Sequence, residues 1–462
     1  MSHAALLSVD LDAAAEKPLF RQLYDDLSQS IRTGQIKPGA QLPPSRSFAQ
    51  EIGVSRATII AAYDQLIAEG YAVSRVGSGV FASDIGPTAQ EWLIHTPPRR
   101  AEAPKPGRIR PFSHISPDMR VFPHALWAQY VGRVARTEAS GLSDLPDPFG
   151  DWPLRAAIAA HLRDWRGVSA APDQVLITAG SGDALELILQ AVAPPNACIG
   201  LENPGYRVLA QVCQRLGYRP HWLAVDAQGA RLPGQDVVLS VITPSCQFPL
   251  GGTMPIARRQ AHLATKKWLV EDDFDSEFRY AGQPVPALMS LDQRQKVIYL
   301  GSFSKVFSSG LRIGYLVLPE PLIAPMHDVL RQRGGRASIL PQRVLARFME
   351  DGAFHRHIRK MRRLYRGRRA AFLAGIDAHF GGLLNYQDHG AGMSVALRYA
   401  APVNPQHAQR NLTKAGLSCA PLEGYYSGGD PVYGLHCGFC AFDEAEISRG
   451  LQQMQSVLAR LF

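Results

Sequence analysis

The stretch GSFSKVFSSGLRIGY, residues 301–315, decides how the larger part of this chain folds and what that part binds. One β-rich run ends at Ser302 and another begins just after Arg312, so the residues between them lie at the edge of a sheet. A lysine amine becomes reactive toward an aldehyde when it is desolvated, whereas hydroxyls and a guanidinium bind phosphate. We therefore predict a reactive amine at Lys305. The predicted phosphate ligands beside it are Ser302, Ser304 and Arg312.

Three upstream segments supply the other groups that such a site needs. KWLVEDDFDSEF (267–278) ends a strand at Asp272, whose carboxylate would keep a pyridine nitrogen protonated. TAGSGDALEL (178–187) leads a strand into a helix, where N-terminal amides bind phosphate. Tyr206 would stack on a pyridine ring. The glycine-rich segment contributes Gly180, Ser181 and Gly182. Together these segments predict pyridoxal 5′-phosphate (PLP) as the cofactor, with Lys305 as its Schiff-base partner and no metal ion.

Short apolar runs surround these segments and alternate with helical stretches. Continuously apolar strands that alternate with helices indicate a mostly parallel sheet covered on both faces. The runs are VLIT (175–178), ACIGLE (197–202), VVLSVIT (237–243), KWLVED (267–272), VIYLGS (297–302) and IGYLVL (313–318). From about residue 345 the helices lengthen and strands become sparse. The sequence therefore predicts an α/β domain that ends in a smaller α+β lobe.

The first 83 residues carry a different pattern. Apolar residues at steps of four predict a helix between Pro18 and Gly34, and LPPSRSFAQEIGVSRATIIAAYDQLIAEGY (42–71) predicts a short helix from Ser47 to Ile52, a turn and a longer helix. The run 71–82 then predicts a hairpin. This order is that of a winged helix-turn-helix, which reads DNA through the start of its second helix. The predicted DNA contacts are Arg46, Ser55, Arg56, Thr58, Arg75 and Gly77. Ser55 has a second interpretation as a helix cap.

The composition of the chain predicts its domain boundaries and its cellular compartment. The Pro-rich, charged segment 84–111 is a predicted linker between a DNA-binding domain, 1–83, and an effector domain, 112–462. There is no apolar run of membrane-spanning length and no signal peptide, so we expect a cytoplasmic protein without membrane contact. Six cysteines without zinc-finger spacing indicate neither disulfides nor structural zinc.

The positive charge of the chain lies outside the predicted DNA reader. The full chain has 49 Lys and Arg against 40 Asp and Glu, but residues 1–84 hold seven against nine. Part of the excess lies in the linker, and part in HRHIRKMRRLYRGRR, residues 355–369. That run is interpreted first as a solvated helix face and second as a site of nonspecific phosphate contact.

The chain resembles the MocR/GabR subfamily of the GntR family of regulators over essentially its whole length. The wing and helix-turn-helix carry the GntR resemblance, and DPFGDWPLRAAIAAHLRDWRGV (147–168), TPSCQFPLGGTMP (243–255) and the basic run carry the rest. The resemblance implies a fold-type I aminotransferase-like domain that binds PLP and forms a head-to-tail homodimer. It also implies that this domain senses an amine or amino acid through aldimine exchange at Lys305.

Five positions depart from the pattern of the subfamily, and two of them, Gly182 and Asp183, stand where glutamines often follow the glycine of the phosphate loop. Phe274 stands where a tyrosine usually contacts PLP, and Cys246 replaces a histidine. Asp183, after Gly182, would repel a phosphate unless it points away. His436 stands where an arginine would hold an α-carboxylate. The predicted effector residues are therefore Arg207, Arg398 and His436.

Three hypotheses about function follow. The first is a PLP-dependent regulator that binds operator DNA and responds to a small amine or amino acid. The second is a working aminotransferase that carries a DNA-binding domain. The third is a regulator whose pocket no longer binds PLP.

Overall fold

The computed structural model describes residues 11–12, 15, 17–86, 110–113, 116–138, 147–283, 285–334 and 337–461. Contacts divide the chain into two units, Met1–Gly107 and Arg108–Phe462. Most of the predicted linker lies outside the described residues, so its boundaries stay a prediction. All six cysteines are described, and each is buried and free.

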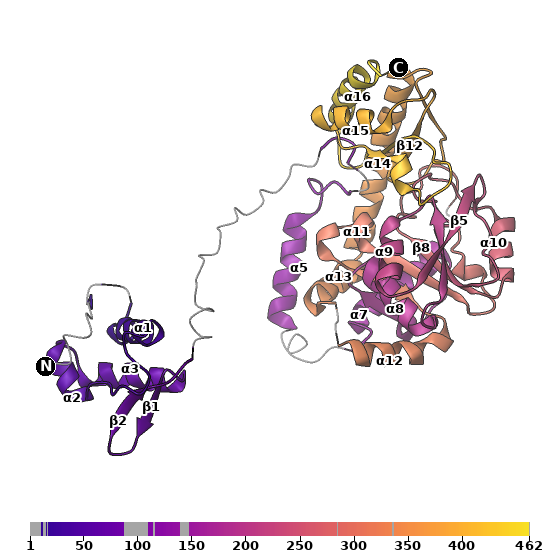
Figure 1. Ribbon diagram of the computed structural model, residues 1–462. Coiled ribbons are helices and arrows are strands. Elements are labelled where there is room, and N and C mark those ends of the chain that lie inside the picture. Colours follow the sequence, from indigo (N-terminus) through magenta and orange to yellow (C-terminus); the bar gives the residue numbers. More distant parts are fainter. Residues whose placement is uncertain are drawn as a thin grey trace. The chain divides into compact units, whose positions relative to one another are not determined.

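The N-terminal unit is a winged helix-turn-helix (Figure 1). Its elements are α1 (Leu19–Arg32), α2 (Ser45–Glu51), α3 (Arg56–Ala68), β1 (Ala72–Arg75) and β2 (Gly79–Ala82). Leu23, Leu27 and Ile31 of α1 are buried, as their spacing predicts. Helix α2 begins two residues before the predicted start, because the extended Pro44 directly precedes Ser45. The two strands pair in antiparallel register as the predicted hairpin.

An eight-stranded sheet in the order β3-β10-β9-β8-β7-β4-β5-β6 forms the centre of the C-terminal unit. Its strands are β3 (Val175–Thr178), β4 (Cys198–Asn203), β5 (Arg219–Asp226), β6 (Gly229–Ala230), β7 (Val237–Ile242), β8 (Trp268–Asp273), β9 (Val297–Ser302) and β10 (Gly314–Val317). The pairs among β4, β5, β7, β8 and β9 are parallel, and β10 runs antiparallel to both of its neighbours. All six predicted strands are present. The sequence analysis missed β5, whose short apolar run 222–225 belongs to a strand in which most residues are only half-buried.

Helices cover both faces of this sheet (Figure 1). Val175 and Ile177 of β3 pack into one core cluster, whereas Leu176 between them packs into the other. This alternation is the period of two that a strand imposes on its side chains. The first face is covered by α5 (His124–Thr137), α7 (Trp152–Arg166), α13 (Ile339–Glu350) and α14 (Ala353–His379). The second face is covered by α8 (Ser181–Val192), α9 (Arg207–Arg215) and α12 (Ile323–Arg333). A further helix, α10 (Ile256–Ala264), packs near the β5–β7 side.

The chain ends in the predicted α+β lobe, which α14 joins to the large sheet (Figure 1). An antiparallel sheet in the order β11-β12-β14-β13 packs there with two helices. The elements are β11 (Leu384–Tyr386), β12 (Ser394–Tyr399), β13 (Ala420–Pro421), β14 (Gly434–Gly438), α15 (Pro405–Lys414) and α16 (Glu444–Leu458). Their apolar side chains belong to the same core cluster as α7 and α13, so the lobe shares a core with the first face of the large sheet.

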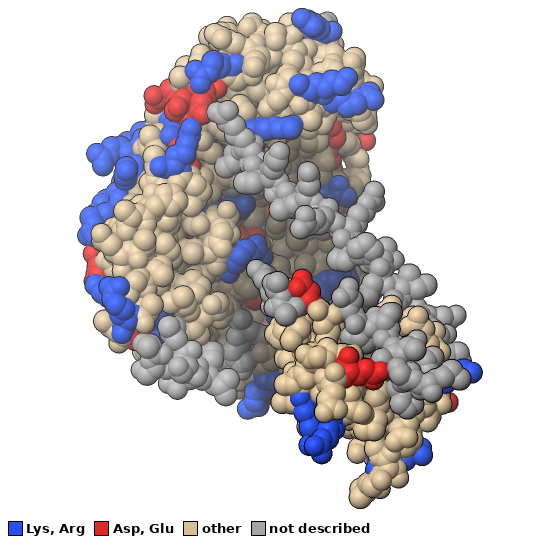
Figure 2. Space-filling model, turned by 90° about the vertical axis from the view of Figure 1, so that its left-hand side faces the viewer, with Lys and Arg blue, Asp and Glu red and all other residues tan. Residues whose placement is uncertain are grey.

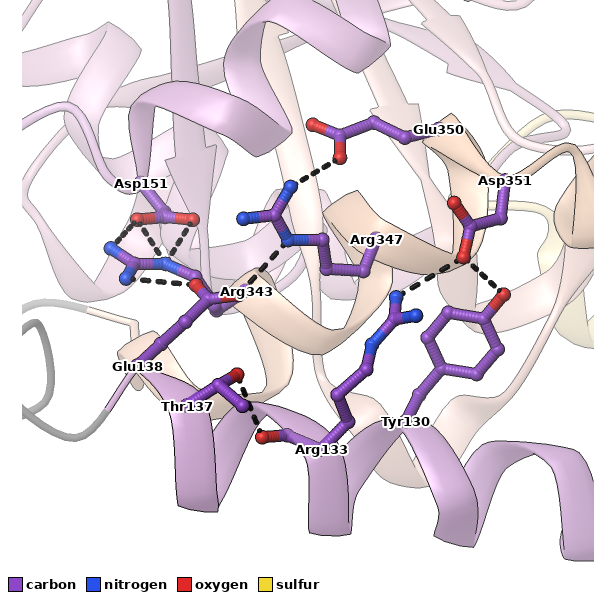
Figure 3. Close-up of polar contacts among 9 residues, drawn as sticks. All are labelled: Tyr130, Arg133, Thr137, Glu138, Asp151, Arg343, Arg347, Glu350 and Asp351. Atoms are coloured by element: carbon purple, nitrogen blue, oxygen red, sulfur yellow. Dashed lines mark hydrogen bonds and ion pairs between the residues drawn. The ribbon is translucent and has the colours of Figure 1, made fainter.

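A polar network fixes the end of α5 to α13 and to the start of α7 (Figure 3). Arg343 Nε donates to both carboxylate oxygens of Asp151 at 3.0 Å, and its Nη1 donates to Glu138 at 3.2 Å. Arg347 Nε also donates to Glu138, at 3.0 Å. Because Asp151 is buried, the Arg343 fork satisfies a carboxylate that water cannot reach.

Candidate DNA reader and cofactor pocket

The predicted DNA-contacting residues of the helix-turn-helix lie at the start of α3 and on α2. Arg46, Ser55 and Arg56 are exposed, and Thr58 is half-buried. Ser55 caps α3, because its Oγ accepts from the Thr58 backbone N–H at 3.1 Å. Arg56 Nε donates to Ser45 Oγ at 3.3 Å, which holds α3 against α2. The capping interpretation of Ser55 therefore describes the structure, and its contact with phosphate stays a prediction.

The wing presents its turn to solvent. Gly77 has φ +73°, a left-handed conformation that glycine adopts without strain, and it forms the turn between the two strands. Arg75 lies over the ring of Phe81, with its guanidinium carbon 4.7 Å from the ring centroid. Val76 beside them is fully exposed. The turn therefore leaves backbone and one guanidinium exposed to solvent, and the DNA contacts of Arg75 and Gly77 stay a prediction.

A cavity of about 240 Å³ lies where strands of the large sheet end. Thr178 of β3 and Ser302 of β9 both pair with Gly314, so the last residues of these two strands lie at the same edge of the sheet. Ligands of open α/β sheets bind at this carboxyl edge. The lining includes Gly180, Ser181, Tyr206, Arg207, Asp272, Ser302, Ser304, Lys305 and Arg312. The structure thus brings together most of the residues that the sequence singled out in segments far apart.

One end of the cavity has the character of an anion site. Gly180, with φ +118°, directly precedes α8, and Arg312 has the left-handed φ of +53°. A Cβ atom at position 180 would lie 3.3 Å from Arg312 Nη2, so glycine lets the guanidinium approach the start of the helix. The Ser302 hydroxyl accepts from the Ser304 backbone N–H at 3.2 Å. Gly182 lies in the first turn of α8 but is outside the cavity lining in the described part of the chain.

Lys305 and Asp272 lie in the same cavity, and burial shifts both of their pKa values. Burial lowers the pKa of the Lys305 amine, and the nearby carboxylates of Asp275 and Asp272 oppose that shift. Burial, with repulsion from Asp273 and Glu202, raises the pKa of Asp272 to about 7, against the opposing charge of Lys305. The cavity therefore holds an amine that loses its proton more easily than usual beside a carboxyl that ionises less easily.

Aromatic side chains line the remaining walls of the cavity. Phe248 meets the ring of Tyr206 at 6.0 Å and that of Phe274 at 5.8 Å, both edge-to-face. Phe274 supplies no hydroxyl, so this wall has no donor at that position. Cys246 lies outside the cavity lining of the described residues, and its thiol faces the carbonyl of Gly251 at 3.9 Å.

Asp183 points away from the anion site. One carboxylate oxygen accepts from the Ala179 backbone N–H at 2.8 Å, and the other lies 2.7 Å from Arg333 Nη1. Its charge is therefore neutralised by an arginine that the sequence did not single out. The expected repulsion of a phosphate by Asp183 is removed by this pairing.

Of the three predicted effector residues, the structure brings one into the cavity. Arg207 lines it, and its Nη1 donates to the carbonyl of Gly424 at 3.2 Å. Arg398 lies exposed on β12. His436 is fully buried, with its ring nitrogens 3.0 Å from Tyr425 Oη and 2.7 Å from Ser394 Oγ. In the described part of the chain, neither Arg398 nor His436 lines the cavity.

Among the cavity residues that sequence reasoning missed are Glu202 and Tyr425. Glu202 accepts from the backbone N–H of Thr243 at 3.1 Å and from Gln247 Nε2 at 3.3 Å. Burial raises the pKa of Glu202 to about 7. The only sequence signal for this residue is a carboxylate at the end of an apolar strand, just before Asn203-Pro204-Gly205. Tyr425 comes from the small lobe, where no local pattern indicates a site.

One group of metal-ligand types lies elsewhere in the described chain, at Cys198, His221 and Asp236. The charges of Arg219 and Lys267 both act on Cys198 there, which disfavours a bound cation. The absence of a metal ion stays a prediction. No helix among the described residues is long and apolar enough to cross a membrane.

Comparison with known families accounts for both units. Residues 19–82 match bacterial regulatory proteins of the gntR family, and residues 127–429 match aminotransferase class I and II. The probable rhizopine catabolism regulatory protein MocR of Rhizobium meliloti is 34% identical over 98% of this chain and 96% of its own. The chain belongs to the MocR-type GntR regulators. This membership makes the N-terminal unit a DNA-binding domain and the whole chain a transcription regulator.

Another relative of similar identity is also a named transcriptional regulator. The pyridoxine biosynthesis regulator PdxR of Corynebacterium glutamicum is 34% identical over 92% of each chain.

Among solved structures, an archaeal alanine:glyoxylate aminotransferase has a TM-score of 0.72 at 22% identity, over 77% of this chain and 92% of its own. The α-aminoadipate aminotransferase of Thermus thermophilus has a TM-score of 0.68 at 25% identity, over 76% and 92%. The C-terminal unit of this MocR-type chain therefore has the fold-type I aminotransferase fold, whose family depends in general on PLP.

Proposed function

We propose that the C-terminal unit binds PLP at Lys305 and uses it to sense a small amine or amino acid. The observation that carries this proposal is the meeting of Lys305, Asp272 and Arg312 in one cavity at the carboxyl edge of the sheet. An amine, a carboxyl group and a guanidinium are the partners of an aldehyde, a pyridine nitrogen and a phosphate, respectively. The similar α-aminoadipate aminotransferase was solved with N-(5′-phosphopyridoxyl)-L-leucine, which adds support from a related fold.

The donor set of the cavity fits this cofactor. Arg312, with the hydroxyls of Ser302 and Ser304, would hold the phosphate against the first amides of α8, next to Gly180. Asp272 would hold a proton on the pyridine nitrogen, and Tyr206 would lie against the ring. When bound, PLP supplies an aldehyde that condenses with a primary amine, either that of Lys305 or that of an effector, and a ring that withdraws electrons.

Lys305 and Asp272 would bind the cofactor and control the protons that its chemistry needs. The lowered pKa of Lys305 increases the neutral fraction of its amine, which is the nucleophilic form. A positive pyridinium next to Asp272 would lower the raised pKa of this carboxyl, so cofactor and carboxylate would stabilise each other's charged forms. Phe248 and Phe274 give the same cavity an apolar wall.

Effector binding would then reach the DNA reader through domain closure. We propose a head-to-tail homodimer in which closure of the small lobe is the two-state element, and in which the linker 84–111 carries the change to two readers. Arg207 is the proposed cavity contact for the effector. Arg398 and His436 remain weaker proposals, since both lie outside the lining of the described cavity.

The visible absorption spectrum of the purified protein tests the proposal. We expect a band that borohydride bleaches and that Lys305→Ala lacks, whereas the matched surface variant Lys414→Ala keeps it. Primary amines can then be screened as effectors by their change to that band. Absence of a band after added PLP would favour a pocket that no longer binds the cofactor. Sustained turnover of an amino acid with a keto acid would favour a working aminotransferase.

A further inference from the structure

The basic run of α14 divides into two faces with different partners. Facing the core, Arg368 pairs with Asp118 at 2.9 Å, and Arg362 Nε donates to the carbonyl of Glu277 at 2.9 Å. Arg369 pairs with Asp388. These three arginines hold the helix in place, and they account for part of the run without any external partner.

The opposite face of α14 carries five exposed cations, which we call the α14 stripe. The stripe consists of Arg356, Arg359, Lys360, Arg363 and Arg366. Spacings of three and four residues place them on one side of the helix, over about 15 Å of its length. Among the described residues, no carboxylate pairs with Arg359, Lys360, Arg363 or Arg366, and Arg356 donates to the Asp351 carbonyl at 3.1 Å. One acid, Glu444, lies beside Gly367 at the end of the stripe.

Like charges crowded on one face raise the free energy of the folded protein unless a counter-charge compensates them. The positive charges of the stripe also affect Arg362 on the same helix. Burial lowers the pKa of Arg362, the charges of Arg366 and Arg359 lower it further, and the charge of Glu277 opposes this shift. Figure 2 shows that Lys and Arg side chains are more widespread than Asp and Glu on the face of the C-terminal unit that it presents. A polyanion bound along the stripe would relieve this repulsion.

We propose that the α14 stripe binds the phosphate backbone of double-stranded DNA outside the bases that the helix-turn-helix reads. DNA is the polyanion that this regulator already binds through its GntR domain. Residues 1–84, which contain that domain, hold seven basic against nine acidic residues, so the reader alone offers little of the electrostatic attraction that DNA binding uses. Four arginines among five cations suit phosphate, because a guanidinium can form two parallel hydrogen bonds to it.

The salt dependence of DNA binding by the full PLP-loaded protein tests this proposal. Arg359→Gln/Lys360→Gln/Arg363→Gln/Arg366→Gln removes four stripe charges and keeps good helix formers. The matched control, Arg410→Gln/Lys414→Gln/Arg449→Gln/Arg460→Gln, removes four exposed cations from or next to α15 and α16. On a long operator fragment, we expect the magnitude of the negative slope of log K against log salt to fall by about 2 to 3.6 in the stripe variant, since each phosphate contact contributes about 0.9. The control should keep the parent slope.

Fragment length and chemical protection separate the possible outcomes. On a fragment trimmed to the operator, the stripe variant should match the parent, which shows that the reader is intact. Long DNA, but not the trimmed fragment, should protect Lys360 from an amine-acetylating reagent. Equal slopes for the stripe variant and its control on long DNA would overturn the proposal. So would a Lys360 that is unreactive without DNA, since the stripe would then be covered by another subunit.

Discussion

The carboxylate of Asp183 lies 2.7 Å from Arg333 Nη1, so the acid in the first turn of α8 is neutralised by the last residue of α12. Arg333 also approaches Glu186 at 3.8 Å on the next turn of α8. The pair joins α8 to α12 on the second face of the sheet. It explains how a helix that begins at an anion site tolerates an acid in its first turn.

Removal of Arg333 should therefore weaken cofactor binding. Arg333→Gln leaves the Asp183 charge uncompensated near the phosphate, and we expect the PLP dissociation constant to rise roughly fivefold, from about 1 kcal/mol of repulsion. Titration of the PLP-free protein with PLP, followed by absorbance, measures it. Arg331→Gln on the same helix should have no effect, and adding Asp183→Asn to Arg333→Gln should restore affinity. An unchanged dissociation constant in Arg333→Gln would contradict this role.

Three buried carboxyls on β4 and β8 predict a fall in stability of the PLP-free protein as pH rises. The pKa values of Asp272, Glu202 and Glu271 are raised to about 7, first of all by burial. Between about pH 4 and pH 7 the folded chain holds protons that the unfolded chain has lost, so stability falls with rising pH across that window. Each such group lowers the free energy of unfolding by roughly 1.4 kcal/mol for each pH unit in that window.

Asp272→Asn removes one of these groups. In urea unfolding of the C-terminal unit at pH 5, 6 and 7, we expect the decline in stability with pH to be shallower by that amount than in the parent. Asp328→Asn, at an exposed carboxylate of α12, should leave the decline unchanged. Identical declines in the parent and in Asp272→Asn would show that Asp272 is ionised throughout.

Capping by Ser55 and its contact with DNA can be separated by two substitutions. Ser55→Ala removes the cap of α3 and should lower the unfolding free energy of the N-terminal unit by about 1 kcal/mol. Ser55→Asp keeps a cap and complements the helix dipole, so stability should be maintained, while its charge should weaken operator binding about tenfold through phosphate repulsion. Thermal unfolding and an operator titration measure the two effects. Full operator affinity in Ser55→Asp would place Ser55 away from the DNA.

The network in Figure 3 predicts unequal costs for two arginines that lie close together. Arg343→Met leaves the buried carboxylate of Asp151 without its partner, and we expect a loss of about 3 kcal/mol in unfolding free energy. Arg133→Met breaks a pair with Asp351 in which both side chains are about half exposed, and it should cost less than about 1 kcal/mol. Denaturant unfolding of both variants at one pH measures these two losses of unfolding free energy. Equal losses would show that burial does not control the strength of these pairs.

The sequence alone indicated the two units, six strands of the large sheet and the main polar residues of the cavity. Apolar spacing at four residues fixed α1, and continuous apolar runs fixed six strands, because those patterns follow directly from the periods of helices and strands. Lys305 and Arg312 could be placed together because one short segment between two adjacent strands carries both. Ser55 could be placed at the start of α3 because a cap is a local interaction.

Tertiary structure alone decided how distant residues meet. Arg333 reaches Asp183 only because α12 packs beside α8, and nothing in either local sequence indicates that pair. His436 lies on an inner strand of the small sheet. Its buried ring forms hydrogen bonds with Tyr425 and Ser394 and does not line the cavity. Local patterns fix each element, since they depend on neighbouring residues in the chain. Charge compensation and side-chain direction depend on which elements pack together, and only the folded chain determines that.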